Sequence, residues 1–177
     1  MAGTAQTIKR LFTPGWWVTT RCLLRYKAKV SPRAEVELTD LLHMGKGTVV
    51  GSYSKLKCSE GPLEIGEGVL IGTHCFISSH PGGVTIGDHS MLGPFASVLG
   101  NDYRYDRLDI PVSQQPKSSK GVVIGKGVWI GAGVVVLDGA NIGDGAIVTP
   151  NSVVSGRVKA NTVVQGNPAR PLFVRRP

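Results

Sequence analysis

Residues 122–155 read VVIGKGVWIGAGVVVLDGANIGDGAIVTPNSVVS, and this stretch decides the fold. A large aliphatic residue recurs at every sixth position: Ile124, Ile130, Val136, Ile142, Val148 and Val154. A second inward candidate, often smaller, stands two positions before each of them: Val122, Val128, Val134, Ala140, Ala146 and Ser152. Glycine or serine follows four of the six large aliphatics.

Each group of six residues is typical of one short strand followed by a turn. Residues two apart in a strand face the same side, so each hexad offers two inward positions. A period of six fits neither the 3.6-residue period of a helix nor a two-residue alternation broken by hairpin turns. The repeat therefore predicts an all-β protein, a parallel β-helix in which each coil buries its inner face against its neighbours.

The composition of the whole chain agrees with that fold. The chain has 177 residues, long enough for one domain with a core, and its 24 glycines and 11 prolines suit a turn-rich structure. Three cysteines without metal-type spacing are interpreted as free thiols. No apolar run is long enough to cross a membrane and no secretory signal is recognisable, so we expect a cytoplasmic protein.

Residues 1–29 form a basic amphipathic segment ahead of the repeats. Residues 1–33 carry seven lysines and arginines and no acidic residue, interleaved with apolar residues such as Trp16 and Trp17. Pro14 and Gly15 limit any helix to about residues 16–27. Two interpretations stay open together. The segment caps the open end of the first coil, and residues 8–29 make peripheral contact with the anionic inner face of the membrane.

The six-residue spacing has interruptions that divide the rest of the chain. It is irregular over the first members, which are Val30, Val36, Leu42, Val50 and Leu56. It slips by three residues within 79–83 and stops for 26 residues between Val98 and Ile124. We predict a β-helix domain over residues 30–172, a protruding loop over about 100–120 and a basic tail over 173–177. A long connection inside a compact repeat is usually functional or disordered.

Several motifs resemble those of the hexapeptide-repeat acyltransferases, which include maltose, serine and polysaccharide O-acetyltransferases. They are the Ile-Gly hexads, DIPV at 109–112, VWIGAG at 128–133 and VVQGNPAR at 163–170. The resemblance covers about residues 60–172. It implies a left-handed parallel β-helix, a homotrimer, and acetyl-CoA bound as co-substrate in the cleft between neighbouring subunits.

Acyl transfer from a thioester to a hydroxyl or an amine needs a general base and a donor for the oxyanion. Histidine is the natural base near neutral pH, and the chain has four of them. The loop position at which many relatives carry the base histidine holds Tyr103 here. His80 is the candidate catalytic base, because SHPGGVTIG at 79–87 resembles the pattern around the catalytic histidine of serine acetyltransferases.

The surroundings of His80 are left partly open by the sequence. We expect the register slip to push its side chain out of a corner of the coil. Glu64, Glu67 and Asp102 remain alternatives for the carboxylate that orients the ring. Backbone N–H groups of Gly82 or Gly83 are candidates for binding the oxyanion, because glycine allows close approach.

The resemblance also places the ligand contacts. Gly131 and Ala132 would contact the pantetheine arm of CoA through their backbone, and Thr149 would do so one coil later. Lys126 and Arg170 would meet the phosphates of CoA.

The start of the loop, at Asn101, Asp102 and Tyr103, is assigned to the acceptor. Trp129 precedes the inward Ile130 and should therefore face outward, toward a subunit interface or a ligand.

No metal site is expected. His74, His80 and His89 each stand three residues after a repeat aliphatic, and three hexads per coil would place them on three different walls. His43 is expected on a surface turn.

The sequence thus predicts an acetyl-CoA-dependent O-acetyltransferase that acts on a hydroxyl, or on an amine, of a sugar. The acceptor class is a polysaccharide or lipopolysaccharide precursor, including a lipid-linked saccharide at the membrane. Two alternatives stay open. One is a catalytically inactive scaffold subunit, which the missing loop histidine favours, and the other is a zinc hydrolyase like carbonic anhydrase. Nucleic acid is not expected as a partner.

Overall fold

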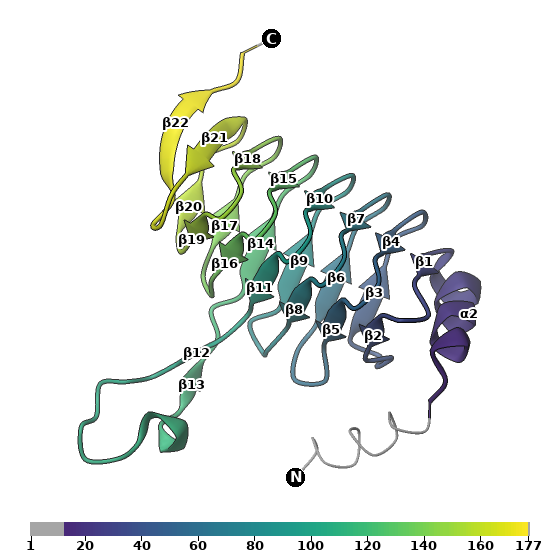
Figure 1. The fold of residues 1–177 in the computed structure, drawn as a ribbon. Coiled ribbons are helices and arrows are strands. Elements are labelled where there is room, and N and C mark those ends of the chain that lie inside the picture. Colours follow the sequence, from purple (N-terminus) through teal and green to yellow (C-terminus); the bar gives the residue numbers. More distant parts are fainter. Residues whose placement is uncertain (1–12, 177) are drawn as a thin grey trace.

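The computed structural model describes residues 13–176, which form a three-sided parallel β-helix with a helix at one end and an arm at one corner (Figure 1). The first wall contains β1 (Lys29–Val30), β4 (Val49–Val50), β7 (Leu70–Ile71), β10 (Met91–Leu92), β15 (Trp129–Ile130), β18 (Ile147–Val148), β21 (Thr162–Gln165) and β22 (Arg170–Val174). The second wall contains β2 (Glu35–Val36), β5 (Lys55–Lys57), β8 (Phe76–Ser78), β11 (Ser97–Leu99), β16 (Val135–Val136) and β19 (Val153–Val154). The third wall contains β3 (Leu42–Met44), β6 (Leu63–Ile65), β9 (Val84–Ile86), β14 (Val122–Ile124), β17 (Asn141–Ile142) and β20 (Arg157–Val158).

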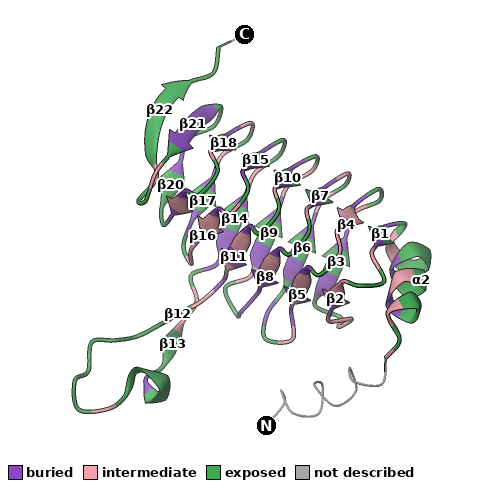
Figure 2. Ribbon diagram, viewed as in Figure 1, coloured by how far each residue is buried: buried purple, intermediate pink, exposed green. Residues whose placement is uncertain are grey.

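The hexad aliphatics stack in register inside the prism. On the third wall, Ile65 pairs with Ile86, Ile86 with Ile124, and Ile124 with Ile142, and all four are buried. Figure 2 shows the same alternation of buried and exposed residues along the coils. The predicted parallel β-helix is confirmed, and its handedness remains the expectation that the resemblance implies.

The structure corrects one prediction in the irregular first coil. The spacing predicts Leu42 as the hexad aliphatic, but Met44 pairs with Ile65, whereas Leu42 pairs with Leu63 in the other inward position. The chain therefore needs two extra residues to pass from Val36 to Met44. Both Leu42 and Met44 are buried, so the first coil is nevertheless complete.

The three corners of the prism differ in the length of chain that they hold. Between the first and second walls, and between the third and first walls, successive hexad aliphatics are always six residues apart, as in Ile71 to Ile77. Between the second and third walls the spacing changes from coil to coil. It is eight, nine, nine, 26, six and four residues, counted from Val36, Leu56, Ile77, Val98, Val136 and Val154. We call this corner the variable corner.

Small polar residues fill some inward positions at the corners and are all hydrogen-bonded. The hydroxyls of Thr48, Ser54 and Ser90 donate to backbone carbonyls one coil further on, over 2.8, 2.7 and 2.7 Å. A buried hydroxyl would destabilise the core if it lacked such a partner. These bonds hold successive coils together in addition to the strand ladders.

The helix α2 (Gly15–Tyr26) covers the open end of the first coil, as the capping interpretation expects. Its buried residues are Val18 and Cys22. The hydroxyl of Thr19 donates to the carbonyl of Val30 over 2.9 Å, and that of Tyr26 to the carbonyl of Leu42 over 2.7 Å. Residues 1–12 of the predicted basic segment lie outside the described residues. Within the described range, no helix is both long and apolar enough to cross a bilayer.

The far end of the prism is covered by the C-terminal residues. The strand β22 pairs antiparallel with β21 and projects beyond the coils (Figure 1). Arg175 returns to the body, where its guanidinium donates to the carbonyl of Gly145 over 2.9 Å. The predicted basic tail, 173–177, thus begins inside β22, and Pro177 lies outside the described residues.

The predicted loop at 100–120 is a folded arm that leaves the variable corner (Figure 1). Its base is an antiparallel pair, β12 (Asp102–Tyr103) and β13 (Lys117–Ser118), and its tip carries a short 3-10 helix, η1 (Val112–Gln114). The buried amide of Gln115 fixes the tip by donating to the carbonyl of Arg107 over 2.7 Å. Leu108, at the end of the arm, is 99% exposed.

Candidate active site

The variable corner brings together three turns from successive coils. The turn 58–62 follows β5, the turn 79–83 follows β8, and the arm follows β11. His80 lies in the middle turn. Apart from two extra residues in the first coil, the extra chain among the described residues is therefore concentrated around the candidate base.

Two side chains hold the ring of His80. Its Nδ1 atom lies 3.0 Å from Oε2 of Glu60, and its Nε2 atom lies 3.2 Å from Oγ of Ser78. A carboxylate accepts hydrogen bonds, so the neutral ring carries its proton on Nδ1 and leaves the lone pair on Nε2. Ser78 then donates to that lone pair. This is the tautomer that a general base needs.

The side chain of His80 is not pushed out of the corner, contrary to the expectation from the register slip. The residue is only 7% exposed, and its ring is held between Glu60 and Ser78. Burial lowers the pKa of His80 below its ordinary value. The charge of Glu60 raises this pKa in part, and the charges of Lys117 and Lys57 lower it. The imidazole is thereby kept neutral near pH 7.

Backbone contacts fix the turn that carries His80. The N–H of Ser79 donates to the carbonyl of Lys57 over 2.8 Å, which joins the turn to the coil before it. The carbonyl of His80 accepts from the N–H of Gly83 over 2.7 Å. Gly61 packs against that same carbonyl so closely that a Cβ atom there would lie 1.8 Å from the oxygen. Glycine at position 61 therefore sets the position of the His80 backbone.

The base of the arm is bonded to the same turn. The N–H of Gly100 donates to the carbonyl of Ser78 over 2.9 Å, and the hydroxyl of Ser119 donates to the carbonyl of Gly100 over 2.6 Å. The hydroxyl of Ser119 in turn accepts from the N–H of Gly82 over 2.9 Å. The N–H groups of both Gly82 and Gly83 are thus used within the chain, so the prediction that either serves the oxyanion was wrong.

The carboxylate beside His80 is also not one of those proposed from the sequence. Glu64 is exposed on the strand β6, Glu67 lies in the next turn, and Asp102 accepts from the N–H of Tyr103 over 2.8 Å. The sequence analysis does not identify Glu60. The nine-residue step from Leu56 to Ile65, equal to that from Ile77 to Ile86, is the signal that marks its turn as enlarged.

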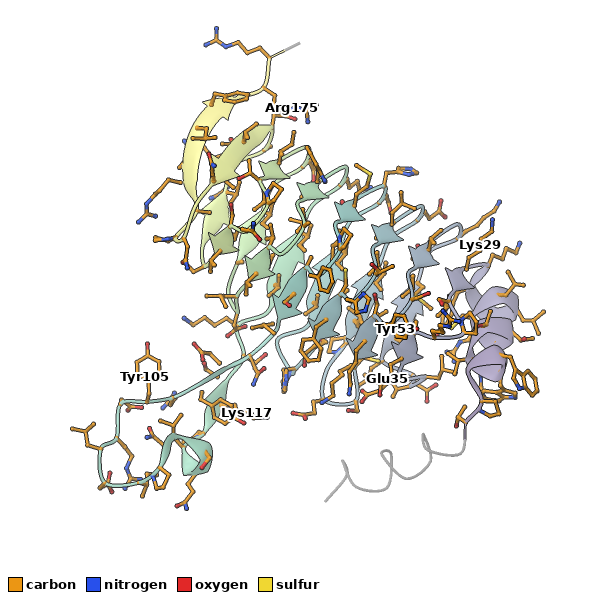
Figure 3. The ribbon with its side chains drawn as sticks, in the orientation of Figure 1. Lys29, Glu35, Tyr53, Tyr105, Lys117 and Arg175 are labelled. Carbon is orange, nitrogen blue, oxygen red and sulfur yellow. The ribbon has the colours of Figure 1, made fainter. Side chains whose placement is uncertain are left out.

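The residues assigned to the acceptor lie at the root of the arm, close to the His80 turn. Asn101 directly follows Gly100, and Asp102 and Tyr103 form β12. The ammonium group of Lys117, on the paired strand, lies 5.4 Å from the ring centroid of Tyr103. Figure 3 shows Lys117 near the root of the arm and Tyr105 further out. The acceptor residues and His80 therefore share one corner.

The residues assigned to CoA lie at other places on the prism. Gly131 and Ala132 follow β15 and Thr149 follows β18, so all three occupy the corner between the first and second walls. Gly131 packs on Pro150 of the next coil, with a hypothetical Cβ only 2.5 Å from its nitrogen, which confirms that the two turns are stacked. One chain therefore does not bring these residues to His80.

The two cations assigned to the CoA phosphates are separated from each other. Lys126 lies at the corner between the third and first walls, where its ammonium group is 2.9 Å from Oδ2 of Asp88. Arg170 begins β22 at the far end of the first wall, where it pairs with Gln165.

The other histidines are not assembled with His80. His74 stacks between Tyr53 and Phe95, with centroid distances of 5.0 and 4.9 Å, at the corner between the first and second walls. His89 follows β9 at another corner, and His43 is exposed on β3. Among residues 13–176, no three metal-ligating side chains lie together. The three cysteines are buried and unpaired, and burial raises the pKa of the Cys22 thiol to about 11.

The chain is similar to known proteins in its repeat and in its fold. Residues 121–156 match the family model for the bacterial transferase hexapeptide (six repeats). No match was found among curated proteins. A solved structure of AntD, an N-acyltransferase from Bacillus cereus in complex with dTDP and 3-hydroxybutyryl-CoA, is 19% identical with a TM-score of 0.76, covering 85% of this chain and 81% of AntD.

A second similar structure is the hexapeptide-repeat acetyltransferase VCA0836 from Vibrio cholerae O1 biovar eltor, complexed with acetyl coenzyme A. It is 23% identical with a TM-score of 0.61, and the match covers 99% of this chain and 86% of VCA0836. At such identities the likeness shows the fold. Residues 121–156 thus carry the hexapeptide repeat, and the chain as a whole shares the parallel β-helix fold of the acyltransferases to which it is similar.

Proposed function

We propose that the protein is a CoA-dependent acyltransferase that moves an acetyl group to a hydroxyl or an amine of a sugar. The observation that carries this proposal is the Glu60–His80 pair, held at the root of the arm with a lone pair on Nε2. The fold supports it, because the similar structures are an N-acyltransferase and an acetyltransferase with CoA compounds bound.

The chemistry that follows from this geometry is a direct transfer. Nε2 of His80 accepts the proton of the acceptor hydroxyl or amine, in place of its bond from Ser78, while the acceptor atom bonds to the thioester carbonyl carbon. Glu60 stabilises the imidazolium that forms. The tetrahedral intermediate then collapses, the C–S bond breaks, and the leaving thiolate takes the proton from His80. Free CoA and neutral imidazole are restored, and no other reactant is needed.

The acceptor site in this proposal is the root of the arm. Asn101, Asp102 and Tyr103 offer an amide, a carboxylate and an exposed ring, which are groups that bind sugar hydroxyls and sugar faces. An AntD variant solved in complex with dTDP-4-amino-4,6-dideoxyglucose and coenzyme A favours a nucleotide-linked amino sugar as a second acceptor class beside the hydroxyl of a saccharide. We retain a lipid-linked saccharide at the cytoplasmic membrane face as the acceptor to test first.

We further propose that the active unit is a homotrimer. The outward residues of the first wall are in register and mostly apolar: Val49, Leu70, Met91, Trp129 and Ile147. The outward row of the third wall includes the polar residues His43, Glu64, Thr85 and Asn141. An apolar row of this length on one wall is expected where another subunit packs.

A trimer would also bring the residues assigned to CoA close to His80 of a neighbouring subunit. Gly131, Ala132 and Thr149 occupy a different corner from His80, and the arm extends away from its own prism (Figure 1). CoA bound along Gly131 and Thr149 of one subunit would present its thioester to His80 of a neighbour. Arg170 and Lys126 are retained as phosphate contacts in this arrangement.

The proposal is tested by release of free thiol from acetyl-CoA in the presence of lipid-linked saccharides, free saccharides and nucleotide-linked amino sugars. The variant His80→Gln should lose roughly 10²- to 10⁴-fold in kcat/KM, the usual contribution of a general base. His89→Gln, at an exposed turn, is the matched control and should keep the wild-type rate. Hydroxylamine treatment distinguishes an ester product, which it cleaves, from an amide. Full activity in His80→Gln would overturn the assignment.

The burial of His80 specifically favours a second candidate, an inactive scaffold in which Glu60 and His80 are a structural pair. Thermal unfolding with and without acetyl-CoA separates the two functions. A ligand that binds only the native state raises the unfolding midpoint, so a shift supports the enzyme. No shift at millimolar acetyl-CoA, with no thiol release, would favour the scaffold.

A further inference from the structure

The outer side of α2 is largely apolar and exposed. Val18 and Cys22 face the first coil and are buried, whereas Trp16 and Leu24 are 65% and 79% exposed. Leu23 and Trp17 are also exposed. Figure 2 shows α2 exposed over much of its surface at the end of the molecule. The helix therefore caps the coil with one side and presents the other to its surroundings.

The exposed apolar residues are contiguous around the helix. At about 100° per residue, the order around the outer side is Leu23, Trp16, Thr20, Leu24 and Trp17, an arc of about 120°. The buried pair, Val18 and Cys22, lies on the opposite side. We call the outer arc the α2 outer face. A row with two tryptophans and two leucines is more than the scattered single apolar residues of ordinary surfaces.

Positive charge borders this face. Arg21 lies over the ring of Trp17, with its guanidinium carbon 4.9 Å from the centroid, and Arg25 follows one turn later. Arg25 makes an ion pair with Asp40 at 3.9 Å, in which the Asp40 side chain is fully exposed. Such a surface pair is weak. Lys27 and Lys29 follow the helix, and residues 1–33 include no acidic residue.

An apolar groove adjoins the face. A cavity of about 310 Å³ opens between α2 and the first coil, and Leu23 lines it as well as the outer face. The other residues that line the cavity are mostly aliphatic or small: Thr19, Ala28, Val30, Ser31, Val49 and Val50. Lys29 also lines it. Figure 3 shows Lys29 beside the helix. The exposed apolar surface therefore continues past the helix and is again accompanied by a cation.

Charge distinguishes between the possible occupants. A second copy that used the same face would bring Arg21 and Arg25 against their own counterparts, which is unfavourable. An anionic bilayer instead offers acyl chains for the leucines, an interface that tryptophan prefers, and negative headgroups for the arginines. A helix with one apolar and one cationic side is the form that lies in the plane of a membrane interface.

We propose that the α2 outer face docks the protein on the surface of an anionic phospholipid bilayer. The helix lies in the interface with Trp16 and Leu24 inserted among the headgroups and Arg21 and Arg25 on lipid phosphates. The prism then stands with its capped end toward the membrane. This inference is independent of the proposed activity and rests on the contacts of α2 alone.

The geometry also sets where the candidate site would stand above the bilayer. The strand β8, which precedes His80, is the third strand of its wall from the capped end. Strands in a ladder are about 4.8 Å apart, so His80 lies roughly 10 Å beyond the first coil. A helix of about 10 Å diameter separates that coil from the lipid surface. The site would thus be about 20 Å from the headgroups.

Vesicle co-sedimentation of the full chain tests the docking. We expect the protein to bind vesicles of phosphatidylcholine that contain about 30% phosphatidylglycerol, and we expect this binding to fall steeply as the salt concentration rises. Vesicles of phosphatidylcholine alone should bind little protein. The double variant Trp16→Ser/Leu24→Ser should lose roughly tenfold or more in partitioning, because each buried apolar side chain contributes substantially. Arg21→Gln/Arg25→Gln should lose a similar factor on anionic vesicles.

Point variants are preferable to deletion of the helix, since deletion would uncover Val18, Cys22 and the end of the first coil. Leu108→Ser, at the tip of the arm, removes another fully exposed leucine and is the matched control that should bind as wild type. The proposal is overturned if wild type does not sediment with anionic vesicles, or if the α2 variants sediment equally well. It is also overturned if those variants change the mass of the particle in light scattering, because the face would then lie between subunits.

Discussion

Nδ1 of His80 lies 3.0 Å from Oε2 of Glu60, a residue from the coil before it. This distance joins two enlarged turns at one corner and fixes which ring nitrogen carries the proton. Both residues lie outside the hexads, in turns that are longer than the six-residue spacing requires. The pair is therefore the first place to test the proposed chemistry.

Glu60→Gln should lower kcat and move the acidic limb of the kcat/KM profile to lower pH. The carboxylate raises the pKa of His80, so its removal lets that pKa fall further. The rate at the plateau should also fall, because a neutral amide neither stabilises the imidazolium nor fixes the tautomer. A pH–rate profile from pH 5 to 9 measures both effects. A lower rate with no displacement of the limb would contradict a direct effect on His80.

Lys117→Met should move the same limb in the opposite direction. The charge of Lys117 lowers the pKa of His80, so its removal raises that pKa and the base is protonated at higher pH. Lys120→Met removes a nearby exposed cation that does not act on His80 and is the control. An identical displacement in the two variants would indicate a general effect of net charge.

Stability should fall in mild acid partly through His80. A histidine whose pKa is lowered by folding favours the native state fully above its unfolded pKa, about 6.5, and this contribution is lost as the pH falls through the lower native pKa. Urea midpoints at pH 7.5 and 5.5 should therefore differ more for wild type than for His80→Gln. Equal acid sensitivity of the two proteins would mean that His80 does not contribute.

Gly61→Ala should destabilise the protein and lower its activity together. The added Cβ atom would lie 1.8 Å from the carbonyl oxygen of His80, so the turn must move. Overpacking of this kind costs about 1–3 kcal/mol. Gly156→Ala, where an added Cβ meets nothing within 4 Å, should be nearly neutral in both chemical unfolding and thiol release. Wild-type activity in Gly61→Ala would show that the His80 backbone position is not critical.

Trp129→Glu should dissociate the proposed trimer. Trp129 and Val123 are both 45% exposed, but Trp129 lies in the apolar row of the first wall and Val123 on the third wall. Light scattering should give one third of the wild-type mass for Trp129→Glu and an unchanged mass for Val123→Glu. Retention of the wild-type mass by both variants would place the interface elsewhere.

The fold could be predicted from the sequence because inward residues repeat along the chain. Ile130 is followed by Val136 and Ile142 at fixed spacing, and each makes the same contacts one wall later. The error at Leu42 arose because both inward positions of that strand are aliphatic, so the spacing alone did not say which one begins the next hexad.

The site could be predicted only in part, for a physical reason. His80 stands in a visible break of the repeat, but its partner Glu60 is set by the stacking of turns rather than by spacing. The same holds for Ser119, which bonds Gly82 across 37 residues of sequence. Contacts between irregular turns depend on the path of each turn, and a six-residue period says nothing about that path.

The unequal corners have a consequence for how such a chain can diversify. Two edges of the prism keep a constant chain length and maintain the ladder register, so the third can gain or lose residues without disturbing the core. Exchanging the segment between Leu99 and Val122 for another of different length should therefore leave folding intact. The arm, to which we assign the acceptor, is thus a part of the chain that can be exchanged without change to the β-helix.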